Sequence, residues 1–364
     1  MQPLSGLLVL DFTTLLPGPL AALMLVEAGA EVIKIERPEG EDMRRFLPDW
    51  DGDSAAFALL NRGKTNLTLD LKSDADRAML APLLERADIL IEQFRPGVMA
   101  RFGLDYESVA KINPRIVYCS ISGYGQKGPR ESEAGHDINY IGATGLLDLQ
   151  AGPPRQPIVP PALIADVAGG SFPAVINILL ALRAREQSGQ GCYLDIAMTD
   201  AMFSFAVFAQ ATGQASGKFP KSGELFVAGG SPRYQLYPAK DGKLIACGAL
   251  EQKFWEAFTA AIGLPREFID DKRDPNVTKI AIAKLIKART SDEWRPIFAK
   301  ADCCATIVAT LEEALRDPHF VQRGLFAHDV SGAAGKVMPA LPLPIDPGFR
   351  AKPGAKPSPK LGKP

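Results

Sequence analysis

Cysteine is scarce in this sequence of 364 residues, and the five copies form no C-x-x-C pair. A sparse, odd set of thiols argues against a disulfide framework and a structural zinc site, and it fits a reducing, cytoplasmic location. Histidine is scarcer still, since only His136, His319 and His328 occur. Chemistry that needs an imidazole is therefore confined to three positions.

An excess of charge of one sign is also missing. Lys and Arg number 41 and Asp and Glu 42, so the formal net charge is −1. This balance argues against a nucleic-acid binder, although a local basic pocket could still hold a phosphorylated ligand. The N-terminus carries no basic region, and no apolar run approaches the roughly 20 residues that span a bilayer. Neither a signal peptide nor a membrane partner is expected.

A third absence concerns dinucleotide cofactors. The apolar run at 7–12 is followed by Leu15-Leu16-Pro17-Gly18-Pro19, where a dinucleotide-binding fold would carry G-x-G-x-x-G. Without that pattern, binding of NAD or FAD is disfavoured.

The sequence does contain a regular alternation of strand and helix patterns. Short apolar or alternating runs predict strands, and longer runs predict helices. Strands are expected at 7–12, 31–36, 67–71, 89–94, 116–122 and 193–197, and helices at 20–28, 74–87, 98–112, 167–185 and 199–212. This order predicts an α/β fold, an open sheet with helices on both faces.

The second half of the chain predicts a smaller unit. A linker or mobile loop is expected at 215–232, which is rich in Gly, Ser and Pro. A hairpin around Lys240-Asp241-Gly242 and the helices that follow it predict a small α+β domain at 225–320. The large domain is expected to span 1–220, and the Pro- and Lys-rich end to lie as an extended strap within 321–364.

Basic residues lie at the ends of several of the expected strands. They are Arg37, Arg62, Lys64, Lys72 and Arg95. Ligands of open α/β sheets bind beyond the strand ends, where such cations would suit a nucleotide diphosphate. Each residue taken alone fits a solvated surface charge equally well.

The most informative stretch runs from Gly135 to Gly170. It opens with Gly135-His136-Asp137-Ile138-Asn139-Tyr140 and later carries Asp166 ahead of an apolar helix. We interpret His136 and Asp166 as two opposed bases that act on one acidified C–H bond. His136 also fits a core or capping histidine, and Asp166 a helix N-cap. Backbone N–H groups near Asp166 could hold an enolate oxygen.

Glu251 opens an amphipathic helix at 251–262. It fits a first-turn glutamate that is favoured by the helix dipole. The functional alternative is a partner of His136 that orients the imidazole and tunes its pKa.

Together these motifs resemble the family III CoA-transferase superfamily, the CaiB/BaiF group, and within it the α-methylacyl-CoA racemases. The most specific matches are residues 135–140, Ala165-Asp166 with Gly169-Gly170, and Gly248-Ala249-Leu250-Glu251. Further matches are Pro17-Gly18-Pro19, Ile35-Glu36-Arg37-Pro38, Leu69-Asp70-Leu71-Lys72, Phe94-Arg95-Pro96-Gly97 and residues 122–129. The resemblance covers nearly the whole chain, to about residue 345.

The resemblance implies a Rossmann-like large domain built from both chain ends, and an intertwined homodimer with each active site at the interface. It implies an acyl-CoA thioester substrate and no separate cofactor, flavin or metal. His136 and Asp166 match the catalytic bases, and Glu251 the glutamate beside the histidine. The matching CoA and substrate contacts are Arg37, Leu69, Asp70, Leu71, Lys72, Arg95, Gly135, Asp137, Asn139 and Tyr140.

Two other functions stay open. In a CoA-transferase, Asp166 would attack the acyl-CoA and become an aspartyl-CoA thioester, a scheme in which His136 and Glu251 have no required part. A non-catalytic CoA-ester binder would hold the ligand without exchanging its α-proton. The sequence lacks a long polyglycine run at 229–232, which favours the racemase. It also lacks the family's acidic C-terminal helix. Whether the C-terminal strap returns to the large domain is therefore left open.

Overall fold

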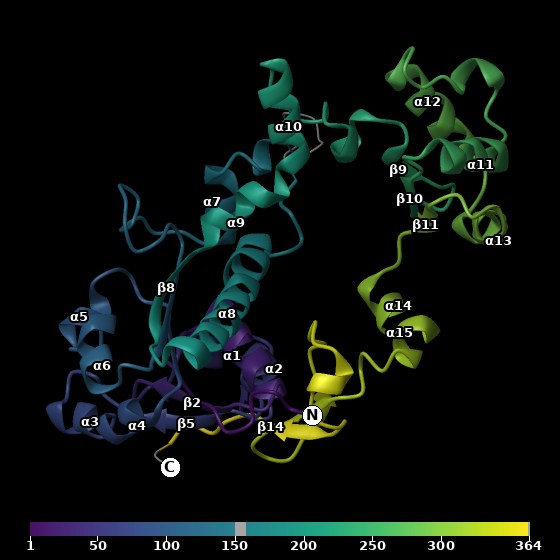
Figure 1. Ribbon diagram of the computed structural model, residues 1–364. Helices are drawn as coiled ribbons and strands as arrows, with labels where there is room; N and C mark the ends of the chain where they lie inside the picture. The colour runs from purple at the N-terminus through teal and green to yellow at the C-terminus, as the bar shows by residue number, and fades with distance from the viewer. Residues whose placement is uncertain (150–157, 363–364) are drawn as a thin grey trace. The chain divides into compact units, whose positions relative to one another are not determined.

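The computed structural model describes residues 1–149 and 158–362, and contacts divide the chain into two units (Figure 1). Unit 1 comprises Met1–Thr144, Pro161–Ser204 and His319–Pro364, and unit 2 comprises Gly145–Pro160 and Phe205–Pro318. This division differs from the expected limits at 220 and 225, because helix α10 (Val207–Ser216) belongs to unit 2. The Phe208 ring of α10 contacts Phe226 of the same unit.

A six-stranded parallel sheet forms the centre of unit 1. Its order is β5 (Thr65–Thr68), β2 (Glu31–Glu36), β1 (Leu8–Asp11), β6 (Ile89–Glu92), β7 (Val117–Ser122) and β8 (Cys192–Ala197). Every neighbouring pair is parallel. The winding direction reverses between β1 and β6, which is the switch point where ligands of such sheets bind. The predicted α/β class is therefore confirmed.

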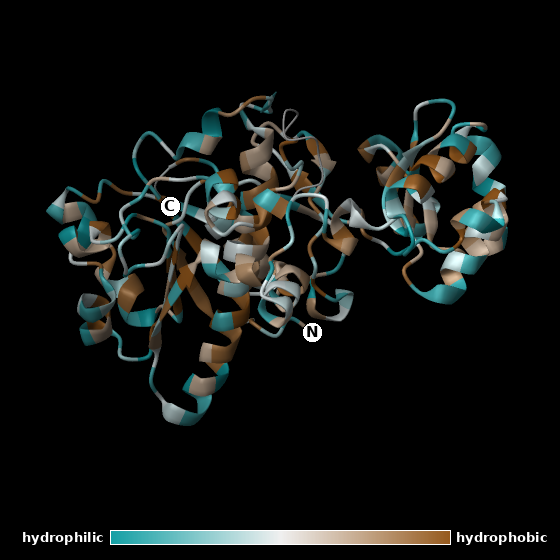
Figure 2. Ribbon diagram, turned by 90° about the horizontal axis from the view of Figure 1, so that it is seen from above, coloured by the Kyte–Doolittle hydropathy of each residue, from teal (hydrophilic) through white to brown (hydrophobic). Residues whose placement is uncertain are grey.

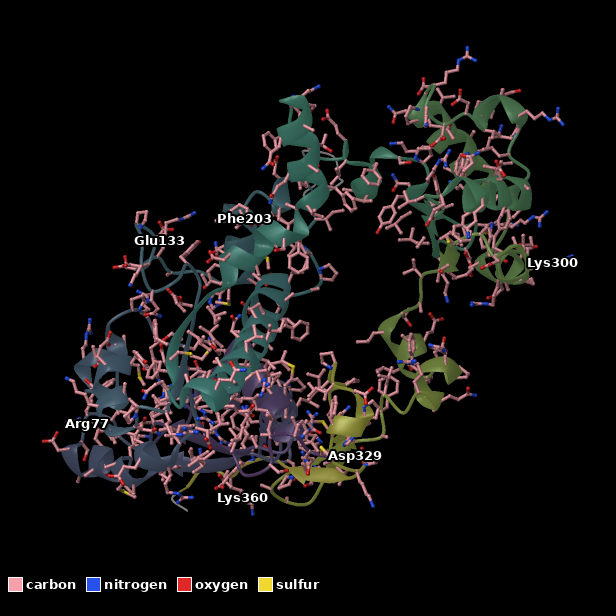
Figure 3. All side chains as sticks on the ribbon, viewed as in Figure 1. Arg77, Glu133, Phe203, Lys300, Asp329 and Lys360 are labelled. Atoms are coloured by element: carbon pink, nitrogen blue, oxygen red, sulfur yellow. The ribbon has the colours of Figure 1, made fainter. Side chains whose placement is uncertain are left out.

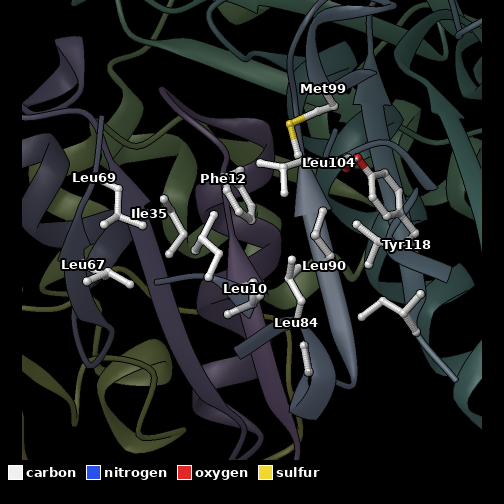
Figure 4. Close-up of a cluster of buried hydrophobic side chains, with 14 residues drawn as sticks. Leu10, Phe12, Ile35, Leu67, Leu69, Leu84, Leu90, Met99, Leu104 and Tyr118 are labelled. Carbon is white, nitrogen blue, oxygen red and sulfur yellow. Dashed lines mark hydrogen bonds between the residues drawn. The ribbon is translucent and has the colours of Figure 1, made fainter. Parts of the chain in front are cut away.

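Helices cover both faces of this sheet, as expected. One face buries residues such as Leu10, Leu90 and Tyr118 in a core to which three helices contribute (Figure 4). These helices are α4 (Ala81–Arg86), α5 (Val98–Arg101) and α6 (Tyr106–Ile112), whereas α3 (Asp74–Ala78) buries none of its residues. The opposite face is covered by α1 (Pro17–Glu27) and α8 (Phe172–Ser188), with α2 (Ala55–Asn61) packed on α1. Apolar residues mark the strands and the helix faces that pack on them (Figure 2).

Several expected elements have other limits. Helix α1 begins at Pro17 and not at residue 20, because a proline in the first turn loses no helical hydrogen bond. The helix expected at 98–112 is interrupted at Gly103, which has a φ of 66°. The strand expected at 67–71 ends at Thr68, because a turn follows in which the Ser73 N–H donates to the Asp70 carbonyl.

Two further helices were expected to be continuous. The one at 74–87 is divided into α3 and α4, with a proline in the first turn of α4. The one at 199–212 is divided at Ala206 into α9 (Met198–Phe205) and α10.

The apolar helix expected at 167–185 is longer than expected. It begins with a π-helical segment, Ala165–Ser171, and continues as α8. By length and composition the combined helix, 24 residues long, could span a bilayer, which corrects the expectation that no stretch could. It packs on β7, β8 and α1, as a core helix of an open sheet does.

Unit 2 has its own core. Its antiparallel sheet has the order β11 (Ala305–Ile307), β10 (Leu244–Gly248), β9 (Tyr234–Pro238), and its other helices are α11 (Gln252–Ile262), α12 (Pro275–Ile286), α13 (Ser291–Ala301) and α14 (Leu311–Leu315). Strands β9 and β10 form the predicted hairpin. Trp255, Phe258 and Trp294 are buried in the core between sheet and helices.

The C-terminal segment belongs to unit 1. After α15 (Pro318–Gln322), strand β12 (Asp329–Ser331) pairs with β13 (Val337–Pro339) and β14 (Ala355–Pro357). The N–H of Gly362 then donates to Asn66 Oδ1 at 3.1 Å, and the N–H of Thr68 donates to the Gly362 carbonyl at 3.3 Å. The tail thus covers the end of β5, an edge strand of the main sheet.

Candidate active site

A cleft of about 500 Å³, cleft A, opens at the carboxyl ends of the strands beside the β1–β6 switch point. Its walls include Thr14 and Leu15 after β1, Gln93–Pro96 after β6, Ile121–Gly123 at the end of β7, and Met198 after β8. The loop before α7 (Asp137–Ala143), which carries Glu133, completes it (Figure 3). His136 and Asp166 both line this cleft.

The backbone of His136 is fixed while its imidazole stays exposed. The residue lies at the N-cap position of α7, and its N–H donates to Asn139 Oδ1 at 3.0 Å. The Tyr140 hydroxyl donates to the Gly135 carbonyl at 2.5 Å. Of the two alternatives, a core histidine is wrong because the residue is exposed, whereas the N-cap position agrees with a capping histidine. The arrangement presents the imidazole to whatever occupies the cleft.

Glycines on two segments allow the close packing of Tyr140. A Cβ atom on Gly123 would lie 2.4 Å from the Tyr140 ring, and one on Gly135 would lie 2.7 Å away. Burial raises the pKa of Tyr140 to about 12, so its hydroxyl stays protonated and donates. The aromatic ring therefore holds the start of the His136 motif against the end of β7.

Asp166 is half-buried in the π-helical segment. Burial, followed by the neighbouring Asp137 carboxylate, raises the pKa of Asp166 to about 6, and His136 lowers it in part. A carboxyl with this pKa can accept a proton and return it near neutral pH. Widened helical turns of this type are frequent at functional sites.

One expectation for Asp166 is wrong. It is not an N-cap, because Ile164 precedes the π-helical segment that contains it. The N–H of Asp166 itself donates to Asp137 Oδ1 at 3.0 Å, and the expectation that other N–H groups nearby hold an enolate oxygen stays a prediction. Asp137, expected to contact the ligand, is only 5% exposed and does not line cleft A. It supports Asp166 from inside the fold.

Small residues fix the π-helical segment on its neighbours. A Cβ atom on Gly169 would lie 2.4 Å from the Met198 carbonyl oxygen, and one on Gly170 would lie 3.0 Å from Pro17 Cβ. The Ser171 hydroxyl donates to the Pro17 carbonyl at 2.7 Å. The position of Asp166 is thus set by direct backbone contact with α9 and α1.

A second cleft, cleft B, of about 280 Å³ adjoins cleft A and shares Thr14 and Phe94 with it. It is lined by five of the predicted CoA contacts, Arg37, Leu69, Asp70, Leu71 and Lys72. Arg95 instead lines cleft A. The residues that the sequence grouped together therefore fall into two adjoining clefts.

The predicted cations differ in their surroundings. Arg37 and Lys72 are exposed, and Arg37 also pairs with Asp42 at 2.5 Å. Arg62 and Lys64 are buried, which contradicts both sequence-based interpretations of them. Arg62 Nε lies 3.3 Å from Glu27, and Lys64 Nζ lies 2.8 Å from Asp11. These two residues hold the core together and cannot contact a nucleotide.

The loop between β1 and α1 rests on buried charges that the sequence did not indicate. Lys34 Nζ lies 2.9 Å from Glu41 Oε1 and donates to the Thr13 carbonyl at 2.8 Å. Glu41 Oε2 accepts from the Leu15 N–H at 2.6 Å. Thr14 lies between these anchors and lines both clefts. Its place after a buried strand was the only signal for it.

Glu251 belongs to unit 2, whereas the two predicted bases belong to unit 1. It is exposed and occupies the N-cap position of α11, one residue before the helix and not in its first turn. Its partnership with His136 stays a prediction. Over residues 1–149 and 158–362, no group of three or more His, Cys, Asp or Glu side chains could hold a metal ion.

The fold is an α/β fold of the doubly wound type, with two adjoining clefts beside its switch point. A family model described as CoA-transferase family III matches residues 4–364. The chain belongs to this family, and the resemblance found in the sequence is confirmed.

Individual relatives include both racemases and transferases. Human alpha-methylacyl-CoA racemase is 33% identical, over 96% of this chain and 90% of its own length. The acetyl-CoA:oxalate CoA-transferase of Acetobacter aceti is 32% identical, over 94% and 89%. A solved CAIB/BAIF family protein from Brucella suis has a TM-score of 0.84 and 32% identity, over 99% and 96%. The family acts on acyl-CoA thioesters, and similarity alone does not separate the two reactions.

Proposed function

We propose that this protein is an α-methylacyl-CoA racemase-like enzyme that inverts the α-carbon of 2-methylacyl-CoA thioesters. The observation that carries the proposal is the presence of His136 and Asp166 in one cleft, with the pKa of Asp166 raised to about 6. An imidazole and a carboxyl of this kind suit a reaction that moves a proton from one face of a carbon to the other.

The proposed reaction has two proton transfers. The thioester carbonyl acidifies the α-C–H bond, and one base takes the proton while the electron pair moves toward the carbonyl oxygen. The planar enolate then receives a proton on its opposite face from the conjugate acid of the other base, and the carbonyl re-forms. Asp166 and His136 exchange the roles of base and acid when the opposite enantiomer reacts.

We assign the nucleotide of CoA to cleft B. Its apolar wall, which includes Leu69, Leu71 and Phe102, suits an adenine ring. Arg37 and Lys72 on the same cleft suit phosphate groups. Because Thr14 and Phe94 line both clefts, the pantetheine arm would pass between them and bring the thioester to cleft A. No separate cofactor or metal is part of this proposal.

A homodimer and a cytoplasmic location also belong to the proposal. Helix α8 exposes Ile176, Leu179 and Leu180, and a second copy of the chain would bury this apolar face. All five cysteines are unpaired, which suits a reducing compartment. The partnership of Glu251 with His136 belongs to the same proposal.

A CoA-transferase is the second candidate, and transferase relatives at nearly the same identity favour it. In that reaction the Asp166 carboxylate would attack the acyl carbonyl and form a mixed anhydride, releasing CoA thiolate. The thiolate would then attack the aspartyl carbonyl and release the carboxylate.

The test uses one enantiomer of a 2-methylacyl-CoA in deuterated water, without any acyl acceptor. The racemase predicts that deuterium enters the α-carbon as optical purity is lost. If there is no exchange while an Asp166 hydroxamate forms with hydroxylamine, the racemase proposal is wrong and the transferase is supported.

A further inference from the structure

Arg233, in unit 2, joins three segments of the chain through its guanidinium group. Its Nε and Nη2 donate to Asp271 Oδ2 and Oδ1 at 2.9 and 2.7 Å. Its Nη1 donates to the Leu250 carbonyl at 3.2 Å, and Nη2 also donates to Gln252 Oε1 at 3.1 Å. The guanidinium carbon lies 4.9 Å from the centre of the Trp255 ring.

The ion pair between Arg233 and Asp271 anchors this arrangement. The side chains of Arg233 and Asp271 are 14% and 8% exposed, so the ion pair is shielded from water. Two parallel hydrogen bonds fix the plane of the guanidinium group. The Trp255 indole N–H donates to the Ile269 carbonyl at 2.9 Å, which ties the segment before Asp271 to α11.

The two residues that Arg233 holds, Leu250 and Gln252, stand on either side of Glu251. On the helix side, the Glu251 carbonyl accepts from the N–H groups of Phe254 and Trp255 at 3.1 and 3.0 Å. On the strand side, the Arg233 side chain donates a hydrogen bond to the Leu250 carbonyl and so holds the loop that precedes α11. Glu251 is thereby presented on a short segment that is fixed at both ends.

We propose that Arg233 is a positioning residue that acts through Glu251. It holds the Leu250–Gln252 loop so that Glu251 has one orientation when it serves His136. The inference rests on the proposed function, in which Glu251 orients the histidine and tunes its pKa. Lysine cannot replace Arg233, because an ammonium group has no planar fork to hold Asp271 and the loop together.

The experiment compares R233K, E251Q and R233K/E251Q in the full-length protein, by α-proton exchange of 2-methylacyl-CoA. Each single variant should lower kcat about tenfold and leave KM within about twofold, because cleft B is in unit 1. Both should change the pH dependence of kcat in the same direction. The double variant should be no slower than E251Q, since residues that act through one group are not additive.

Two matched variants control for folding. R289K changes another guanidinium of unit 2, which lies 5.1 Å from the Trp294 ring, and it should leave exchange unchanged. Q252A removes only one of the contacts with Arg233 and should lower kcat less than R233K, with the fold intact. If Q252A lowers kcat in the parent protein but has no further effect on kcat in the E251Q variant, the result supports the positioning role of Arg233. This conclusion does not depend on R233K.

The outcomes separate the two claims. If E251Q lowers exchange and R233K multiplies that loss, or if R233K acts only on KM, Arg233 does not work through Glu251 and the inference is overturned while the proposed function stands. If E251Q changes neither rate nor pH profile, the proposed role of Glu251 fails, and the inference fails with it.

Discussion

Asp166 is placed where its charge costs folding stability. Because its pKa in the folded protein is about 6 and its ordinary value is 3.8, the folded state favours the protonated form. Its contribution to stability is therefore full below pH 3.8 and is lost as the pH rises through 6. The Asp166 carboxyl can therefore carry a proton near neutral pH, but it lowers the folding stability, as is common for residues at functional sites.

The variant Asp166→Asn tests this cost. It removes the charge with little change of shape, and we expect it to raise the free energy of unfolding at pH 8 by about 1 kcal/mol, a figure reduced for partial exposure. This increase in the free energy of unfolding should disappear below pH 4. Urea denaturation at pH 4, 6 and 8 measures it. A variant no more stable than the parent protein at pH 8 would contradict the raised pKa.

Asp137 offers a second test at the same scale. The Asp137→Asn variant keeps an oxygen for the Asp166 N–H and removes the carboxylate that raises the pKa of Asp166. That pKa should fall, so the acidic limb of the pH–rate profile should move to lower pH for the enantiomer that Asp166 deprotonates. If the acidic limb stays at the same pH or moves to higher pH, the charge of Asp137 does not raise the pKa of Asp166.

Among the elements, the π-helical segment Ala165–Ser171 matters most, because it carries Asp166 and is fixed by backbone contacts. The sequence predicted a helix here but gave no sign of the wider turn. Within this segment Gly169 closely approaches the Met198 carbonyl, a contact between distant segments that local periodicity does not contain.

We expect Gly169→Ala to disturb this element. The added Cβ would lie 2.4 Å from the Met198 carbonyl oxygen, so the segment or α9 must move. The cost should be about 1–3 kcal/mol of stability, with slower α-proton exchange. Gly362→Ala is the control, because no atom lies within 4 Å of its added Cβ. Equal thermal stability of the two variants would contradict the proposed contact.

At the scale of the whole molecule, the sequence predicted the open α/β sheet because its strands contain short apolar runs, such as residues 8–10 and 89–91. It placed Arg62 and Lys64 wrongly because charge at a strand end predicts exposure, whereas both have buried carboxylate partners from other elements. His136 and Asp166 were found by motif, and the structure places them in one cleft. Thr14 was missed, since only its place after a buried strand marks it, and Phe94 was found as part of a matching motif but was not expected to line both clefts.

The exposed apolar face of α8 leads to a prediction about assembly. Leu180 is 63% exposed, and a dimer that buries it should be weakened by a charge there. Leu180→Glu should therefore lower the mass measured by light scattering from that of a dimer toward that of a monomer. Leu311→Glu, at an exposed leucine of α14, should leave the mass unchanged. A parent protein that is already monomeric would contradict the proposed homodimer.

The central claim is that His136 and Asp166 serve opposite faces of one α-carbon. The most direct test measures α-proton exchange in deuterated water for each pure enantiomer with the His136→Ala and Asp166→Asn variants. Each variant should lose racemisation but still exchange the enantiomer that faces its remaining base, so the two variants should retain opposite enantiomers. If both variants retain the same enantiomer, or both racemise normally, the two-base account is wrong.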